Sequence, residues 1–115
     1  MSRQTYAAPR EARERWPELS AFISASVHGD NDVPVEEDVD RCMASYDLKK
    51  RQALVREWWN WNATAGAVDD IRFAIEALDS NVLFGDADHA RKFMNACYDK
   101  LITSVRRELG KDWKP

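Results

Sequence analysis

Apolar residues recur at intervals of three and four along most of this chain, which is the spacing of amphipathic helices. The pattern predicts five helices, over residues 17–28, 34–46, 47–65, 68–79 and 86–109. Glycines that suit helix ends follow three of them, at Gly29, Gly66 and Gly110. No segment alternates apolar and polar residues for long enough to predict a strand. We therefore expect an all-α fold, a compact bundle of about five helices.

The apolar positions of each predicted helix fall on one face, and these faces should form the core. The clearest stripes are Leu19, Phe22 and Ile23; Val39, Cys42, Met43 and Tyr46; Leu54, Trp58 and Trp61; Ile71, Ile75 and Leu78; and Ala90, Phe93, Met94, Cys97, Leu101, Val105 and Leu109. Cys42 and Cys97 lie on these stripes, so we expect both as reduced core side chains. Two cysteines do not make the disulfide framework of a secreted domain.

The chain of 115 residues has the length and composition of one globular domain, with 44% apolar and 32% charged residues. Residues 1–15 contain four arginines and no apolar run, so we interpret them as a frayed end or a short extra helix and not as a secretion signal. No apolar run approaches the roughly 20 residues that cross a bilayer. We expect a cytoplasmic protein with no membrane partner.

The net charge of −3 conceals strong alternation along the chain. Residues 16–47 have a net charge of −7, and residues 91–115 have a net charge of +4. The densest segment, 30–40, contains six acidic residues and no base. Nucleic-acid binders usually present a dominant basic face, so direct nucleic-acid binding is not the expected function. The acidic segment is either a solvated face or a surface that attracts a basic protein.

Three tryptophans within four helical positions, Trp58, Trp59 and Trp61, are the most unusual feature of the chain. At about 100° per residue they cover an arc of roughly 300°, which is wider than one core face. One ring is therefore expected at the rim of the core or outside it. In one interpretation Trp58 and Trp61 are core residues and Trp59 fills a side pocket. In the other, one ring, with Trp59 as the candidate, anchors a partner protein, since tryptophan is enriched at interface hot spots.

Residue patterns that carry catalysis or bind metal are missing from the sequence. His28 and His89 are the only histidines, and neither has the spacing of a metalloprotease helix or a nearby pair of cysteines. Nucleophile-elbow, phosphate-binding and dinucleotide-binding motifs are also missing. We expect no catalytic residue, no metal and no cofactor, and we do not expect an enzyme.

One part of the chain resembles a known family. The residues that carry the resemblance are Pro17, Glu18, Leu19, Phe22, Val27, His28, Gly29, Asp30, Val35, Glu36, Glu37, Asp38 and Val39. Together they resemble the immunity proteins of bacterial contact-dependent growth inhibition systems over about residues 16–50. Val27 stands where that family usually has an aromatic residue, and Asn31 stands where it has tryptophan. The resemblance implies a small cytosolic antitoxin that binds the C-terminal toxin domain, commonly a nuclease, of an exported protein.

The acidic segment and the resemblance together predict an immunity protein whose partner is its cognate toxin domain. A nuclease is basic where it meets phosphates, and an acidic protein can cover that surface. The residues expected to bind the partner are Asp30, Asp32, Glu36, Glu37, Asp40 and Trp59. One alternative is a small helical adaptor or regulatory module that binds another protein, or itself, through the tryptophan-rich helix. Another is a nucleic-acid binder that uses the basic ends of the last helix.

Overall fold

Six helices account for most of the structure, a computed structural model that describes residues 9–26, 35–67, 70–78 and 86–115. In chain order they are α1 (Pro9–Arg15), α2 (Pro17–Ser26), α3 (Val35–Ala44), α4 (Leu48–Ala63), α5 (Arg72–Ala77) and α6 (Ala87–Leu109). These ranges contain no strand. The all-α prediction is confirmed, and the N-terminal segment contributes the short extra helix α1.

Side chains and a glycine set the ends of the two longest helices. The side chain of Asp47 accepts from the backbone N–H of Lys50 at 2.8 Å and so caps the start of α4. Asp86 caps α6 in the same way, accepting from His89 N at 2.7 Å. Gly110 ends α6 with φ of 108°, a left-handed conformation that side chains disfavour. These boundaries agree with those predicted from the sequence.

Helix α2 is capped by a residue from another helix. It begins at Pro17, whose missing N–H costs nothing in a first turn. The next two N–H groups, of Glu18 and Leu19, both donate to Glu57 Oε1 of α4, at 2.8 and 3.0 Å. Trp16, between α1 and α2, donates its indole N–H to Asn60 Oδ1 at 2.9 Å. The second half of α4 therefore holds both the junction of α1 with α2 and the first turn of α2.

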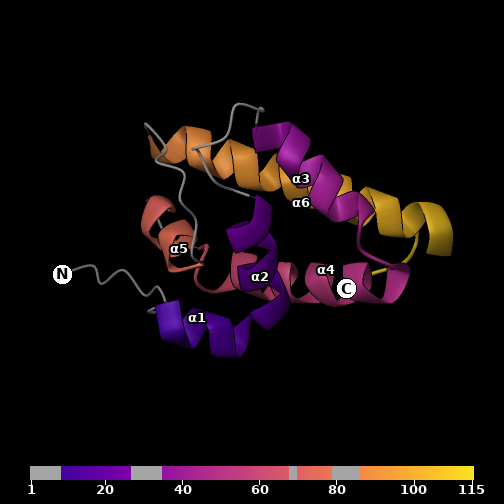
Figure 1. Ribbon diagram of the computed structural model, residues 1–115, viewed down its shortest axis with the longest axis horizontal. Helices are drawn as coiled ribbons and strands as arrows, with labels where there is room; N and C mark the ends of the chain where they lie inside the picture. Colours follow the sequence, from indigo (N-terminus) through magenta and orange to yellow (C-terminus); the bar gives the residue numbers. More distant parts are fainter. Residues whose placement is uncertain (1–8, 27–34, 68–69, 79–85) are drawn as a thin grey trace.

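The two longest helices, α4 and α6, pack against each other and run along the long axis of the molecule (Figure 1). Helix α2 packs on α4, and α3 packs on α2 and lies over α6. Helix α1 lies against α2 and α5 at the opposite side of the bundle from α3. Helices α3 and α6 are thus on the same side of the molecule, away from α1 (Figure 1).

The core lies where α2, α4 and α6 converge. Trp58 and Trp61 are both 0% exposed, as predicted for the inner face of the tryptophan cluster. The ring of Phe22 lies 5.9 Å from that of Trp58 and meets Tyr46 edge to face at 5.7 Å, a favourable arrangement for aromatic pairs. Trp16 is also fully buried. Three large indoles, of Trp16, Trp58 and Trp61, therefore contribute to this core.

Three predictions need correction. The helix expected over 68–79 is shorter, Arg72–Ala77, within the described range 70–78. Leu109, assigned to the inner stripe of the last helix, is 44% exposed because it lies in the last turn of α6, beyond the neighbouring helices that cover Val105. The buried Trp16 was not among the predicted core residues. Across the described ranges, no helix combines the length and apolar character needed to cross a membrane.

Candidate protein-binding surface

The first two turns of α3 present acidic side chains to solvent. Val39 and Met43, one helical turn apart, are buried in the core and fix the orientation of the helix. Glu37 and Asp40 are exposed. The structure thus brings these two predicted binding residues together on one helix, and we call this surface the acidic edge of α3.

Three other predicted binding residues of this segment have no described side chain. Asp30 and Asp32 lie outside the described residues, and Glu36 is described only as a backbone position in the first turn of α3. Their membership of the acidic edge stays a prediction.

Asp40 connects α3 to α6 through an ion pair with Lys100. The ammonium group of Lys100 donates to Asp40 Oδ1 at 3.1 Å and to Oδ2 at 3.4 Å. Both side chains are about half exposed, so water screens the pair and its contribution to stability is about 0–1 kcal/mol. A cation from a partner protein can therefore replace Lys100 at little cost.

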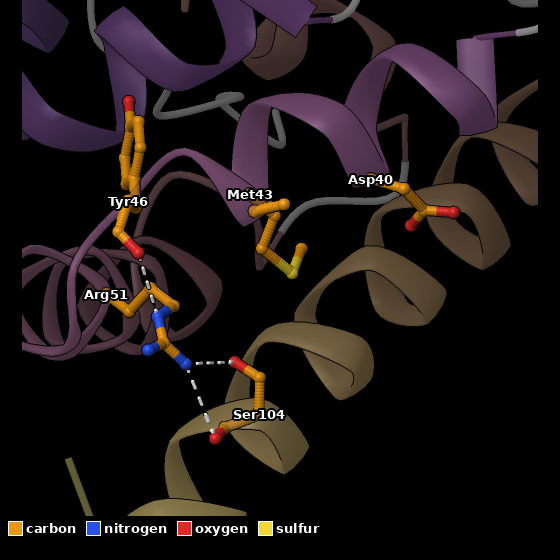
Figure 2. Close-up of a pocket in the computed structure, with 6 residues that line it drawn as sticks. Asp40, Met43, Tyr46, Arg51 and Ser104 are labelled. Atoms are coloured by element: carbon orange, nitrogen blue, oxygen red, sulfur yellow. Dashed lines mark hydrogen bonds between the residues drawn. The ribbon is translucent and has the colours of Figure 1, made fainter.

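A depression of about 340 Å³ lies between α3 and α6, with Asp40 at its edge (Figure 2). Arg51 of α4 extends toward α6 and donates through Nη1 to Ser104 Oγ at 3.3 Å. Its Nε donates to Tyr46 O at 3.2 Å, and its Nη2 pairs with Glu108. Because these contacts occupy the guanidinium, Arg51 ties α4 and the segment between α3 and α4 to α6 and does not present a free charge to a ligand. The mostly apolar hollow with a carboxylate at its edge suits the stem and head of a long basic side chain.

Trp59 marks a second surface, between α4 and α6. Its side chain is 55% exposed although its neighbours Trp58 and Trp61 are buried, so the prediction that one ring of the cluster lies at the rim is confirmed. The ring borders a groove of about 510 Å³ whose other walls include Tyr98 and Ile102 of α6. We call this the Trp59 groove. Its role in binding stays a prediction.

The C-terminal tail closes one side of the Trp59 groove. After the turn at Gly110, Trp113 packs against the core, and its carbonyl oxygen accepts from Arg106 Nε at 2.9 Å. The guanidinium of Arg56 lies 5.8 Å from the centre of the Trp113 ring, in a cation–π contact. These contacts place Lys114 at the wall of the groove. Sequence reasoning missed the tail, and the only local signal for it was an isolated tryptophan after the helix-ending glycine.

Two rows of residues on α6, each with a spacing of four, separate these surfaces. The row that faces Trp59 is Tyr98, Ile102 and Arg106, which all line the Trp59 groove. The row that faces α3 and Arg51 is Lys100, Ser104 and Glu108. A helix with its side chains is about 10–12 Å wide. The two rows are offset by two positions, about 200° around the helix, so the acidic edge of α3 and the Trp59 groove lie on nearly opposite sides of α6.

The reactive side chains of the described residues are arranged as ordinary structural groups. Cys42 and Cys97 are both reduced thiols, as expected, with Cys97 buried and Cys42 partly buried. Burial raises the pKa of the Cys42 thiol, although Tyr46 and Lys50 act against that shift. His89 is exposed in the first turn of α6, and His28 lies outside the described residues. Within the described ranges, no three histidine, cysteine or carboxylate side chains gather into a group that could hold a metal ion.

The geometry therefore offers two surfaces for macromolecular contact, one acidic and one aromatic with basic flanks. Both are built on α6, with α3 beside one and α4 beside the other. Comparison of the chain with protein-family models, with curated proteins and with solved structures gives no match.

Proposed function

We propose that this protein is an immunity protein that binds and neutralises the toxin domain of a contact-dependent growth inhibition system. The observation that carries the proposal is the exposure of Glu37 and Asp40 on one helix, at the end of a segment with six acidic residues and no base. The partner is taken to be a nuclease, as the family resemblance implies. A nuclease is basic where it holds phosphates and therefore complements an acidic surface. The acidic edge of α3 would cover part of that basic surface.

Electrostatics supports this use of the acidic edge. Exposed carboxylates steer a basic partner and raise the association rate, and the effect falls with ionic strength because the Debye length is about 8 Å at physiological salt. Asp40 already binds an ammonium group, that of Lys100, in a weak and exposed pair. A lysine or arginine from a toxin can exchange with it and extend into the neighbouring depression.

The resemblance to the immunity family supports the same proposal from a different direction. The segment that carries it, about residues 16–50, includes α2, α3 and the chain between them. It therefore contains the acidic edge. Family resemblance supplies the class of partner, and the exposed carboxylates supply a surface on which that partner can dock.

Growth rescue tests the proposal. The toxin domain encoded by the reading frame immediately upstream is expressed in a sensitive bacterium, with and without this protein. We expect the wild-type protein to restore growth and to bind the purified toxin domain. An upstream frame that encodes no toxic domain, or a toxin that neither binds this protein nor is neutralised by it, would contradict the proposal.

A matched pair of double variants then locates the surface. Glu37→Lys with Asp40→Lys reverses the acidic edge, and Glu11→Lys with Glu76→Lys makes the same charge change on α1 and α5. Glu11 is a suitable control because it is the third residue of α1, as Glu37 is of α3, and is also exposed. We expect weaker rescue from the first variant only. Equal loss in both variants would indicate a general charge effect and no docking at α3.

The exposed Trp59 favours a second candidate function, a helical adaptor that recognises a protein through the Trp59 groove. Growth rescue separates the two candidates. An adaptor would bind a partner protein in a manner that depends on Trp59, and it would give no rescue from an upstream toxin.

A further inference from the structure

Trp59 is an exposed aromatic side chain beside a preformed groove. Among the described residues its ring has no aromatic or cation–π partner, and more than half of the residue surface is open to water. Tryptophan in such a position can bury a large apolar area when a partner covers it. Tyr98 and Ile102 also line the groove and add to its apolar surface. The groove can therefore hold one apolar side chain of a partner.

The polar groups of the groove determine the charge of that partner. Arg106 uses Nε to hold the Trp113 carbonyl, and its terminal N–H groups make no hydrogen bond or ion pair with other described residues. The ammonium group of Lys114 likewise has no ion pair within the described part of the chain. Asp99 is the one acidic side chain among the residues that line the groove. Two cationic side chains with unused donors outnumber this one acidic side chain, which favours an anionic partner.

The groove is also held in place before any partner binds. Arg106 and Arg56 anchor Trp113 from two sides, and the turn at Gly110 directs the tail back along α4 (Figure 1). The backbone at Lys114 is consequently held through its neighbour Trp113. A preformed site loses less conformational entropy on binding than one that must be ordered.

We propose that the Trp59 groove binds an acidic segment of a partner protein, which inserts an apolar side chain beside Trp59 and places carboxylates against Arg106 and Lys114. This inference does not depend on the proposed contact between α3 and a toxin, since the two surfaces differ in charge and share no residue. A nucleic acid would also use an aromatic ring and cations. It would need a longer basic track than two side chains, and Asp99 would repel its phosphates.

Peptide selection followed by measured affinity tests the proposal. Random peptides displayed on phage are selected on the intact protein and counter-selected on Trp59→Ala. We expect the enriched peptides to carry several carboxylates around an aromatic or aliphatic residue. Fluorescence anisotropy with one such peptide should show binding that Trp59→Ala and Lys114→Glu each weaken by at least about tenfold. The affinity should also fall as salt is raised.

Two control variants report whether these losses are specific to the groove. Phe73→Ala removes another large exposed side chain, on α5, and Lys111→Glu reverses an exposed lysine of the same tail; neither residue lines the groove. Both should change the peptide affinity by less than about twofold. Enrichment of neutral or basic peptides, no enrichment, or binding that survives Trp59→Ala would overturn the proposal. A single-stranded oligonucleotide whose binding requires Trp59 would overturn it in favour of a nucleic-acid site.

Discussion

Replacing Glu57 tests how α2 is held in the bundle. One carboxylate oxygen of Glu57 accepts two backbone N–H groups of the first turn of α2, at 2.8 and 3.0 Å. Loss of a helix-capping acceptor costs about 0.5–2 kcal/mol, and hydrogen bonds to a charged group contribute about 1.5–3 kcal/mol. We therefore expect Glu57→Ala to lower the free energy of unfolding by about 2 kcal/mol. Because this cap joins α2 to α4, the whole domain should unfold at a lower urea concentration.

The conservative change Glu57→Gln keeps an oxygen acceptor and removes the charge. Partial burial raises the pKa of Glu57 above its ordinary value of 4.5, although the two N–H groups act against that shift. A carboxyl whose pKa is higher in the folded state favours folding most at low pH. That contribution is lost as the pH rises through the folded pKa. The stability of the wild type relative to Glu57→Gln should therefore be greatest below the ordinary pKa and should fall above it.

Urea unfolding followed by circular dichroism, between acidic and neutral pH, measures both effects. At neutral pH the glutamine variant should stay within about 1 kcal/mol of the wild type, because its oxygen can still accept both N–H groups. If alanine costs less than about 0.5 kcal/mol, the cap does not stabilise α2. If glutamine is as damaging as alanine, the charge and not the hydrogen-bonded oxygen holds the helix.

Three further substitutions test the packing of α4 and of the turn that follows it. A Cβ on Gly66 would lie 2.9 Å from a ring carbon of the buried Trp61. Gly66→Ala should therefore lower the free energy of unfolding by about 1–3 kcal/mol. An unchanged melting temperature would contradict this close packing. Trp58→Ala should cost about 3–5 kcal/mol, whereas Trp59→Ala should stay within about 0.5 kcal/mol of the wild type. If chemical denaturation shows that Trp58→Ala and Trp59→Ala lower the free energy of unfolding equally, then it is wrong that Trp58 is a core residue and Trp59 a surface residue.

Local sequence signals predicted the features that depend on neighbouring residues. Asp47, Asp86 and Gly110 mark helix ends through hydrogen bonds and backbone conformations that span only a few residues. The helical period likewise distinguished buried Trp58 from exposed Trp59, because 100° of rotation separates adjacent positions. Such features can be derived from one segment alone.

Features that join distant segments could not be derived in this way. Glu57 caps a helix that begins 40 residues earlier in the chain, and Arg51 binds Ser104 across a separation of 53 residues. Helix α1 was uncertain because Ala12 is its one buried apolar residue among positions 11–15, whose side chains are described, and one such residue before Trp16 is too little to form a stripe. The wall that Lys114 adds to the Trp59 groove depends on tertiary packing of Trp113. The contacts of these residues can be identified only when the three-dimensional fold is known.

The acidic edge was predicted as a charged segment, but its relation to α6 was not. Sequence places Asp40 among the acidic residues, and the structure adds that it binds Lys100 and borders a depression. That arrangement turns a general expectation of charge attraction into a surface defined by two residues of α3 and one of α6.

Titration of the purified protein with its upstream-encoded toxin domain, at low and at high salt, tests the central claim most directly. Reversal of Glu37 and Asp40 to lysine should weaken binding by at least tenfold at low salt, which is about 1.4 kcal/mol. The difference from wild type should shrink at high salt, because exposed charges are screened. The Glu11→Lys, Glu76→Lys control should bind as the wild type does. An affinity unchanged by the α3 reversal at both salt concentrations would contradict the claim that this edge binds the toxin.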